Sequence, residues 1–364
     1  YLTRRDDLNA TFAGALAADE PHAYRRRELT EGLPLHLLTR ALVAPLVNEG
    51  RRVLLLVLDG CDLSTLYEVL ESAPTGVGLQ VPSVTGRLKS VLDATGPLFT
   101  ALAPMPTVTS VARRAIFGGE IPRNETLDVN EAHGANASGD KVAFDRNPSL
   151  QSIERRLILK GELGADARAV LDALADPQAK LVATVFNVID DALSSKEITP
   201  LGPWTPGNLG RGLLNVLSAA VEGGWTVVVT ADHGHTPFWA ADRKVTAARG
   251  AGARLSEVAL PDAVTFRATP WRASPLHALT AVGAFAGNQH RGFHGGAGLE
   301  EVVVPVALLG KVSTSAADAR GLPRWWTDAH EPEPTPRAKV PVTAWLDQVP
   351  EGLREVIAHL DAHG

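Results

Sequence analysis

The chain has 364 residues, of which 45% are hydrophobic, and a formal net charge of −6. A chain of this length forms one large domain or two, and it can bury a core that needs no disulfide. The net acidic charge excludes a protein that coats nucleic acid over its whole surface, although a local basic groove is compatible with it.

The single cysteine, Cys61, excludes an internal disulfide and is typical of the reducing cytoplasm. We expect Cys61 to be a small buried hydrophobe, with a reactive thiol as the alternative. No apolar run reaches about 18 residues and no signal peptide is present, so we predict a cytoplasmic protein without membrane contact. The chain begins with Tyr1 and not with Met, and we therefore expect a piece of a longer polypeptide.

Composition divides the chain into three segments. Residues 1–50 are predicted to be an N-terminal helical segment, including an apolar-periodic helix over 33–47. Residues 51–312 are predicted to be the main domain. Residues 313–364 begin with a Pro-rich linker that contains the motif EPEPTP, and they end in one amphipathic helix over 343–362.

Further elements of the main domain follow from periodicity and from turn residues. Strands are expected over 98–103 and 301–309, where Pro305 suggests a sheet edge or a bulge. Helices are expected over 62–72, 151–176, 209–222 and 275–286, and loops over 74–87 and 119–150. The second loop contains His133, and its length is typical of an active-site lid.

Three apolar runs each end in acidic residues. The run VLLLVL at 53–58 is followed by Asp59, and the run that begins at Leu181 ends in Asp190 and Asp191. The third run, WTVVVTADHGH at 225–235, contains Asp232 and His233. Ligands of open α/β sheets bind at the carboxyl ends of the strands, where a carboxylate and an imidazole can share one divalent ion. Ordinary turns that contain Asp, His and Gly are the alternative for each run taken singly.

The motif PTVTSVARRAIFGG at 106–119 carries three hydroxyl groups before a predicted helix. Thr107, Thr109 and Ser110 could cap that helix. One of them could instead be a nucleophile, because the free amides and the dipole of a helix N-terminus stabilise alkoxide and phosphate. Arg113 and Arg114, one turn later, could clamp a phosphate.

A later histidine, His294, lies in the motif HRGFHGGAGLEEVVVP. Gly295 and Gly296 permit a tight turn there, which would let the imidazole reach back over the predicted site.

The order of these motifs resembles the alkaline phosphatase superfamily, and their local texture is similar to PglZ domains of BREX phage-defence systems. This resemblance implies an α/β fold with a mostly parallel central sheet between helices, here followed by a C-terminal helical appendage. It also implies two metals, usually zinc, and displacement at phosphorus through a covalent phospho-enzyme.

The resemblance also implies residue roles. A ten-residue spacing before Gly119 selects Thr109 as the nucleophile. Asp59, Asp232 and His233 would join Thr109 at one metal. Asp190 and His294 would hold the other metal.

One position departs from the family pattern. The family carries a histidine four residues after the aspartate of the second metal, whereas this chain has Ser194 after Asp190. Asp191 or His235 would then complete the second site, or a harder ion such as Mg²⁺ or Mn²⁺ would occupy it.

The resulting hypothesis is a metal-dependent phosphoesterase that favours diesters and acts on a nucleotide or nucleic-acid phosphate in BREX phage defence. Nucleic acid would contact arginines at positions 113, 114, 155, 156 and 291. The alternative is a non-catalytic scaffold or interaction subunit of the defence complex, with a partly degenerate metal site. Other BREX proteins are the expected partners.

Overall fold

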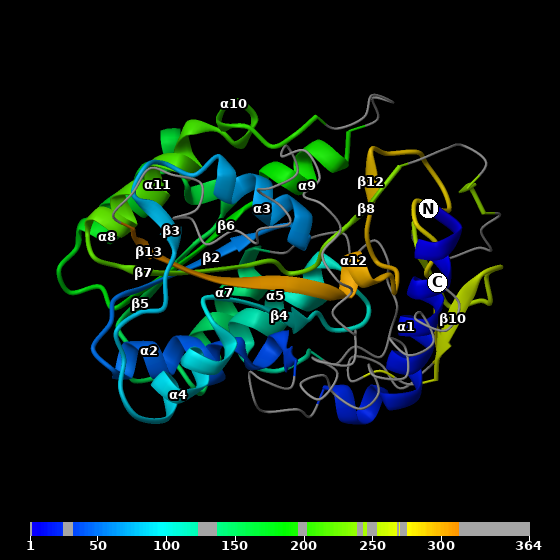
Figure 1. The fold of residues 1–364 in the computed structure, drawn as a ribbon, viewed down its shortest axis with the longest axis horizontal. Helices are drawn as coiled ribbons and strands as arrows, with labels where there is room; N and C mark the ends of the chain where they lie inside the picture. The colour runs from blue at the N-terminus through cyan, green and yellow to red at the C-terminus, as the bar shows by residue number, and fades with distance from the viewer. Residues whose placement is uncertain are drawn as a thin grey trace, which may run out of the picture. The chain divides into compact units, whose positions relative to one another are not determined.

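An eight-stranded sheet forms the centre of the computed structural model (Figure 1). Its strands follow the order β1-β4-β13-β7-β2-β6-β5, and β3 pairs with β13. They are β1 (Leu33–Pro34), β2 (Val53–Leu58), β3 (Val77–Leu79), β4 (Leu98–Leu102), β5 (Arg155–Ile158), β6 (Leu181–Phe186), β7 (Thr226–Thr230) and β13 (Val303–Lys311). Within this sheet, every pairing that does not involve β13 is parallel. The predicted fold class, α/β with a mostly parallel central sheet, is confirmed.

The structure describes residues 2–24, 32–122, 137–195, 202–238, 243–245, 253–267, 269 and 275–312. These residues belong to one unit, Tyr1–Gly321. The predicted linker, the C-terminal helix and His133 lie outside the described residues. The boundaries proposed at residues 50 and 312 therefore remain predictions, although β1 contributes a strand from within the segment that was predicted to be helical.

Helices cover both faces of the sheet. Figure 1 shows α3, α9 and α11 on one side and α2, α4 and α5 on the other. The helices are α1 (Leu2–Ala23), α2 (Ala44–Asn48), α3 (Leu63–Glu71), α4 (Gly86–Thr95), α5 (Thr109–Gly118), α7 (Ala137–Arg146), α8 (Arg168–Ala175), α9 (Val188–Leu193), α10 (Pro206–Leu209), α11 (Arg211–Glu222) and α12 (Leu299–Val302). Every residue of β2 and β6 is buried, because central strands of a covered parallel sheet have no solvent-facing side.

Two small antiparallel sheets lie outside the central one. Strands β9 (Leu255–Ser256), β10 (Ala263–Phe266) and β11 (Leu276–Leu279) form the first, in the order β10-β11-β9. Strands β8 (Thr236–Pro237) and β12 (Gly292–Phe293) form the second. Among the described helices, none is long and apolar enough to cross a membrane.

Several predicted elements are wrong. Residues 276–279, expected in a helix, form β11, where pairing on both sides outweighs local helical periodicity. The expected helix over 151–176 begins as β5, and only its last part forms α8. The expected loop over 119–150 contains α7, and the loop over 74–87 contains β3.

The prediction for Pro305 is also wrong. Strand β13 lies inside the sheet, between β4 and β7, and its register with β4 continues through Pro305 without a bulge. The pairing with β7 begins one residue later, at Val306. Pro305 therefore lies at the position where one of the two ladders stops, where a missing backbone N–H is tolerated.

Candidate active site

The candidate site lies where three neighbouring parallel strands end. Strands β7, β2 and β6 are adjacent in the sheet, and their carboxyl ends share one edge. Asp59 follows β2 directly, and Asp232 lies two residues after β7. Beyond β6, Asn187 leads into α9, whose first turn carries Asp190 and Asp191. Polar side chains from three strand ends thus meet at one edge.

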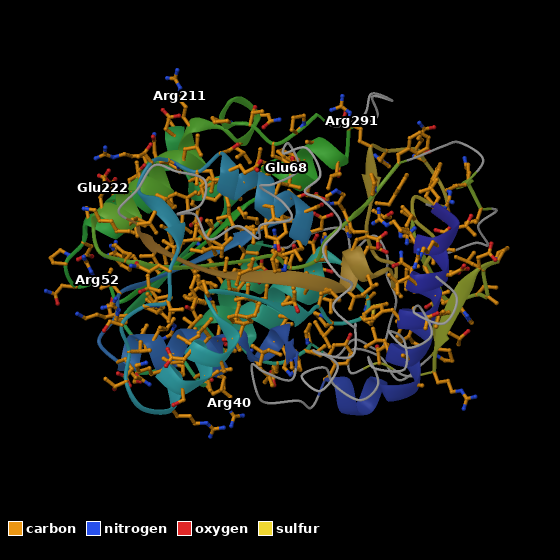
Figure 2. The ribbon with its side chains drawn as sticks, viewed as in Figure 1. Arg40, Arg52, Glu68, Arg211, Glu222 and Arg291 are labelled. Atoms are coloured by element: carbon orange, nitrogen blue, oxygen red, sulfur yellow. The ribbon has the colours of Figure 1, made fainter. Side chains whose placement is uncertain are left out.

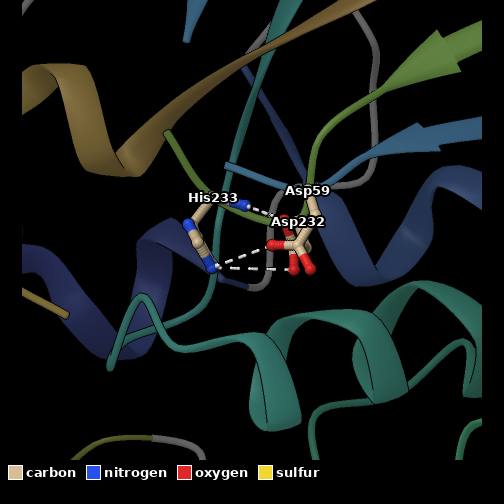
Figure 3. A group of neighbouring side chains, drawn as sticks. All are labelled: Asp59, Asp232 and His233. Carbon is tan, nitrogen blue, oxygen red and sulfur yellow. Dashed lines mark hydrogen bonds and ion pairs between the residues drawn. The ribbon is translucent and has the colours of Figure 1, made fainter. Parts of the chain in front are cut away.

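Asp59, Asp232 and His233 form a buried group whose metal-binding atoms all lie within 4.8 Å of one another. His233 Nε2 lies 3.7 Å from Asp59 Oδ1 and 3.6 Å from Asp232 Oδ2 (Figure 3). The three residues are at most 1% exposed. A Cβ on Gly234 would lie 1.9 Å from the Glu300 carbonyl oxygen, so this close approach requires glycine. The Asp-His-Gly triplet thus combines a close backbone contact with two side chains that lie against Asp59.

Hydrogen bonds to the backbone occupy one ligand atom of Asp232 and one of His233, and they leave Asp232 Oδ2 and His233 Nε2 without a backbone partner. Asp232 Oδ1 accepts from the backbone N–H groups of Gly60, at 3.2 Å, and His233, at 2.9 Å. His233 Nδ1 lies 3.0 Å from the Gly234 carbonyl oxygen. A carbonyl can only accept, so Nδ1 carries the proton and Nε2 keeps its lone pair. A hydrogen bond from the other ring nitrogen to a carbonyl is typical of metal-binding histidines.

The donor set fits a divalent cation. Asp59 Oδ1, Asp190 Oδ1 and Asp232 Oδ2 are buried, and none has a hydrogen-bond partner among the described residues. Burial, followed by the charges of Asp232 and Asp190, raises the pKa of Asp59 well above its usual range. Burial lowers the pKa of His233 to about 4, which keeps the imidazole in its neutral, metal-binding form. A cation among these atoms would remove both the unsatisfied oxygens and the carboxylate repulsion.

Thr109 is the first residue of α5, and its hydroxyl faces this group. Thr109 Oγ1 lies 3.0 Å from His233 Nε2, so the hydroxyl donates to the imidazole. Val108 occupies the N-cap position, and no side chain caps the helix, so the capping alternative is wrong. Helix α5 ends at Gly118, and its C-cap, Gly119, adopts the left-handed conformation, so a glycine ends the helix ten residues after Thr109.

The other two hydroxyls of the motif are placed differently. Thr107 is fully buried; its Oγ1 donates to the Gly296 carbonyl at 2.7 Å and accepts from the Gly295 N–H at 3.1 Å. The loop that carries His294 therefore takes both the donor and the acceptor function of the Thr107 hydroxyl. Ser110 is 7% exposed. Of the three hydroxyls, only that of Thr109 forms a hydrogen bond to the group of Asp59, Asp232 and His233.

Asp190 and His294 lie beside this group. His294 Nε2 is 3.8 Å from Asp190 Oδ1, and His294 Nδ1 donates to the Thr107 carbonyl at 3.1 Å. Ser194 follows Asp190 by one helical turn and caps α9. The Ser194 carbonyl accepts from Nδ1 of His290 at 2.8 Å, so an unpredicted histidine lies next to this position.

The two residues expected to complete the second site are placed differently. Asp191 turns away from the site and pairs with Lys160 at 2.6 Å, where both side chains are more than half exposed. His235 is buried, and its Nδ1 donates to the Gly60 carbonyl at 2.8 Å. Gly60 itself lies against Asp190, because a Cβ on Gly60 would be 3.5 Å from the Asp190 Cβ. Gly60 therefore lies between His235 and the second site.

The arginines of the motif do not form an open clamp. Arg113 is buried between Asp59 and Asp140, and Arg114 packs against Gly139 of α7. Asp140 and Asn187 were not predicted as site residues. Asn187 Nδ2 donates to Asp59 Oδ2 at 2.5 Å. Asn187 could have been found, since it follows β6 directly, as Asp59 follows β2.

Two of the remaining arginines lie at the opposite edge of the sheet from the site. Arg155 and Arg156 begin β5 and pair with the first residues of β6, so they lie at the amino edge of the sheet. Arg156 also pairs with Asp176 at 2.6 Å. Arg291 projects from the surface in Figure 2. Cys61 is 1% exposed, and burial raises its thiol pKa well above the usual value, as expected for a buried hydrophobe.

A family model of the BREX system PglZ alkaline phosphatase-like domain matches residues 38–309. The chain belongs to the PglZ family. The match covers the central sheet from β2 nearly to the end of β13, and it therefore includes every residue of the candidate site. This PglZ domain begins its family match within the segment that was predicted to be separate and helical, just after β1.

Solved structures show a more distant likeness to this PglZ domain. Human ectonucleotide pyrophosphatase/phosphodiesterase 5 is 11% identical, with 72% of this chain and 88% of that chain covered and a TM-score of 0.45. Phosphonoacetate hydrolase from Sinorhizobium meliloti 1021 is 13% identical, with 75% and 93% covered and a TM-score of 0.40. The search of curated proteins found no match.

Proposed function

We propose that this PglZ domain is a metal-dependent phosphoesterase in which Thr109 is the nucleophile. The observation that carries this proposal is the 3.0 Å contact between Thr109 Oγ1 and His233 Nε2, at the edge of the buried Asp59–Asp232–His233 group. The hydroxyl lies at the N-terminus of α5, where the helix dipole favours a developing negative charge.

Asp59, Asp232 and His233 would hold the first divalent metal, and Asp190 and His294 would hold the second. A bound divalent metal lowers the pKa of a neighbouring hydroxyl and neutralises phosphate oxygens. Zinc suits the imidazole and carboxylates of the first site. The second site offers a single histidine and no family histidine at Ser194, which favours Mn²⁺ or Mg²⁺ there.

The proposed reaction has two displacements. Thr109 Oγ1 gives up its proton and attacks phosphorus, a new Oγ1–P bond forms, and the P–O bond to the leaving alcohol breaks as the leaving oxygen gains a proton. Water then attacks this phosphorus, the Oγ1–P bond breaks as Oγ1 regains a proton, and a diester substrate is released as a phosphomonoester. Without metal, neutral His233 accepts the Thr109 hydrogen bond at Nε2. A bound metal would take that lone pair, and the Thr109 hydroxyl would then be free to give up its proton and attack.

We favour a diester over a monoester. A monoester dianion brings one more negative charge than a diester, and the site already contains Asp59, Asp190 and Asp232. The arginine one turn after Thr109 does not offset that charge, because both ends of its fork pair with carboxylates. The substrate class that we propose is a nucleotide or nucleic-acid phosphate. The protein would act on it in the cytoplasm, in BREX phage defence, alongside other BREX proteins.

The test is a hydrolysis assay with bis-p-nitrophenyl phosphate and p-nitrophenyl phosphate, each with Zn²⁺, Mn²⁺ and Mg²⁺. We expect metal-dependent turnover that is faster with the diester, and we expect Thr109→Ala to abolish it. Ser110→Ala, the neighbouring hydroxyl on the same helix, is the matched control and should retain activity. Turnover that survives Thr109→Ala would refute the nucleophile.

The alternative function is a non-catalytic scaffold or interaction subunit. Ser194 supports it, because a neutral hydroxyl stands where the family carries a metal-binding histidine. Metal analysis of the purified protein combined with the same assay separates the two functions. Bound metal without turnover on either ester would favour the scaffold.

A further inference from the structure

Arg113 lies in the interior, between two carboxylates. It follows Thr109 by four residues on α5, so both side chains project from the same face of the helix. Arg113 Nη1 lies 3.2 Å from Asp59 Oδ2, and Nη2 lies 3.1 Å from Asp140 Oδ2. The arginine side chain is 6% exposed and each aspartate side chain is 2% exposed. Salt screens such buried pairs weakly, so each charge acts fully on its neighbours.

The two oxygens of Asp59 have different surroundings. Oδ2 accepts from Arg113 at 3.2 Å and from Asn187 Nδ2 at 2.5 Å. Oδ1 is buried and has no hydrogen-bond partner within the described part of the chain. Asp59 therefore offers a cation one oxygen, and the orientation of that oxygen depends on what holds Oδ2.

Asp140 balances the charge of this arrangement. It is 1% exposed and comes from α7, which packs against α5 and lies outside the sequence motifs of the site. Asp59, Asp140 and Asp232 carry three negative charges when ionised, and Arg113 carries one positive charge, which leaves two negative charges. One divalent cation neutralises that charge. Without Asp140, Arg113 would cancel half of the charge that Asp59 and Asp232 supply.

We propose that Asp140 is a positioning residue for the metal site. Through Arg113 it fixes Asp59 as a one-oxygen ligand, and it supplies the negative charge that keeps Arg113 from competing with the cation. This inference rests on the proposed function, because it requires Asp59 to bind metal. It assigns Arg113 to the support of a ligand and not to the phosphate contact that its place in the motif suggested.

The test uses Co²⁺ as the probe and the full chain after metal removal. Calorimetric titration gives the Co²⁺ affinity, and the visible absorption spectrum reports the ligand arrangement. We expect Asp140→Asn to weaken Co²⁺ binding by about 10- to 100-fold, as the loss of outer-shell partners does, and to change the spectrum. Lys141→Met is the matched control, because Lys141 follows Asp140 on α7 and pairs with Glu162 at the surface. Its loss should leave the Co²⁺ affinity and the spectrum unchanged.

A second variant covers the case in which Asp140→Asn does not fold. Arg113→Lys keeps the charge but cannot fork between two carboxylates, so it should weaken Co²⁺ binding in the same way. A folded variant that keeps the wild-type Co²⁺ affinity and spectrum would overturn the proposal. The result would be clearest if that variant had a higher KM for the ester substrate, because Arg113 would then act on substrate binding. Failure of both variants to fold would also overturn it. A wild-type chain that binds no Co²⁺ would overturn the metal dependence of the proposed function itself, which is a separate result.

Discussion

The imidazole rings of His233 and His294 stack, with centroids 4.0 Å apart and planes inclined by 10°. His233 follows β7, whereas His294 follows β12, and the two belong to different metal groups in the proposed site. Each ring donates from Nδ1 to a carbonyl, so both Nε2 atoms keep their lone pairs. The proposed first site and the proposed second site are therefore in direct contact, although the first has three protein ligands and the second has two.

We predict unequal metal sites. After dialysis the wild-type chain should retain metal at the first site and lose it from the second, which should refill from added Mn²⁺ or Mg²⁺. Ser194→His should tighten the second site, because position 194 follows Asp190 by one turn of α9. Metal stoichiometry with and without this substitution is the measurement. Two tightly held zinc ions per wild-type chain would contradict the prediction, and so would a crystal structure in which Asp191 or His235 completes the second site.

Thr109 and Thr107 should respond differently to alanine substitution. Thr109→Ala should lower kcat by at least about a thousandfold and leave the melting temperature unchanged, because its side chain caps no helix. Thr107→Ala should lower the free energy of unfolding by about 1–3 kcal/mol, because it leaves buried groups of Gly295 and Gly296 unpaired. Turnover and thermal melting are the two measurements. Full activity in Thr109→Ala with a dead, well-folded Thr107→Ala would move the nucleophile to position 107.

Metal removal should lower stability as well as activity. Binding to the native state stabilises it by mass action, by about 2.7 kcal/mol when free metal exceeds its Kd by a hundredfold. EDTA should therefore lower the melting temperature of the wild type but not that of Asp232→Ala, which lacks a ligand. An unchanged wild-type melting temperature, with metal loss verified, would argue against a metal group at Asp59, Asp232 and His233.

His36 should make the stability depend on pH at a point unconnected to the metal ligands. Burial lowers its pKa from 6.5 to about 4, and its Nδ1 has no partner among the described residues. Above pH 6.5 neither state binds the proton. Between pH 6.5 and pH 4 only the unfolded chain binds it, so stability falls as the pH falls.

The loss from His36 should amount to about 2 kcal/mol between about pH 7 and about pH 5. Denaturant unfolding of the metal-free protein measures it, and His36→Gln should lack this part of the slope. Equal slopes in the wild type and the variant would show that the buried imidazole does not control the effect.

The parts of the site that the sequence predicted are those tied to strand ends. Asp59 and Asp232 could be placed because buried β-branched and leucine runs define their strands, and parallel strands align their carboxyl ends. Asp140 could not be placed, since its contact depends on how α7 docks on α5 and no spacing links it to the motif. Asp190 was expected at the end of a strand, but β6 stops at Phe186 and a short helix presents it.

The fold was predictable to a similar degree. Long, uniformly buried strands such as β2 were found because their composition leaves no other reading. Strand β11 was missed because a four-residue strand is decided by its partners, β10 and β9, and not by its own pattern. Local periodicity also could not show that β13 enters the middle of the sheet.

The position of β13 affects the order in which the chain can fold during synthesis. Strand β4, which leads to Thr109, reaches β7 only through β13, and β7 leads to His233. Until residues 303–311 have left the ribosome, β1 and β4 have no link through the sheet to the β7-β2-β6-β5 half. Thr109 and His233 are therefore linked through the sheet by β13, the last strand in the described part of the chain, and a nascent chain that stops short of it lacks this link between the two halves of the candidate site.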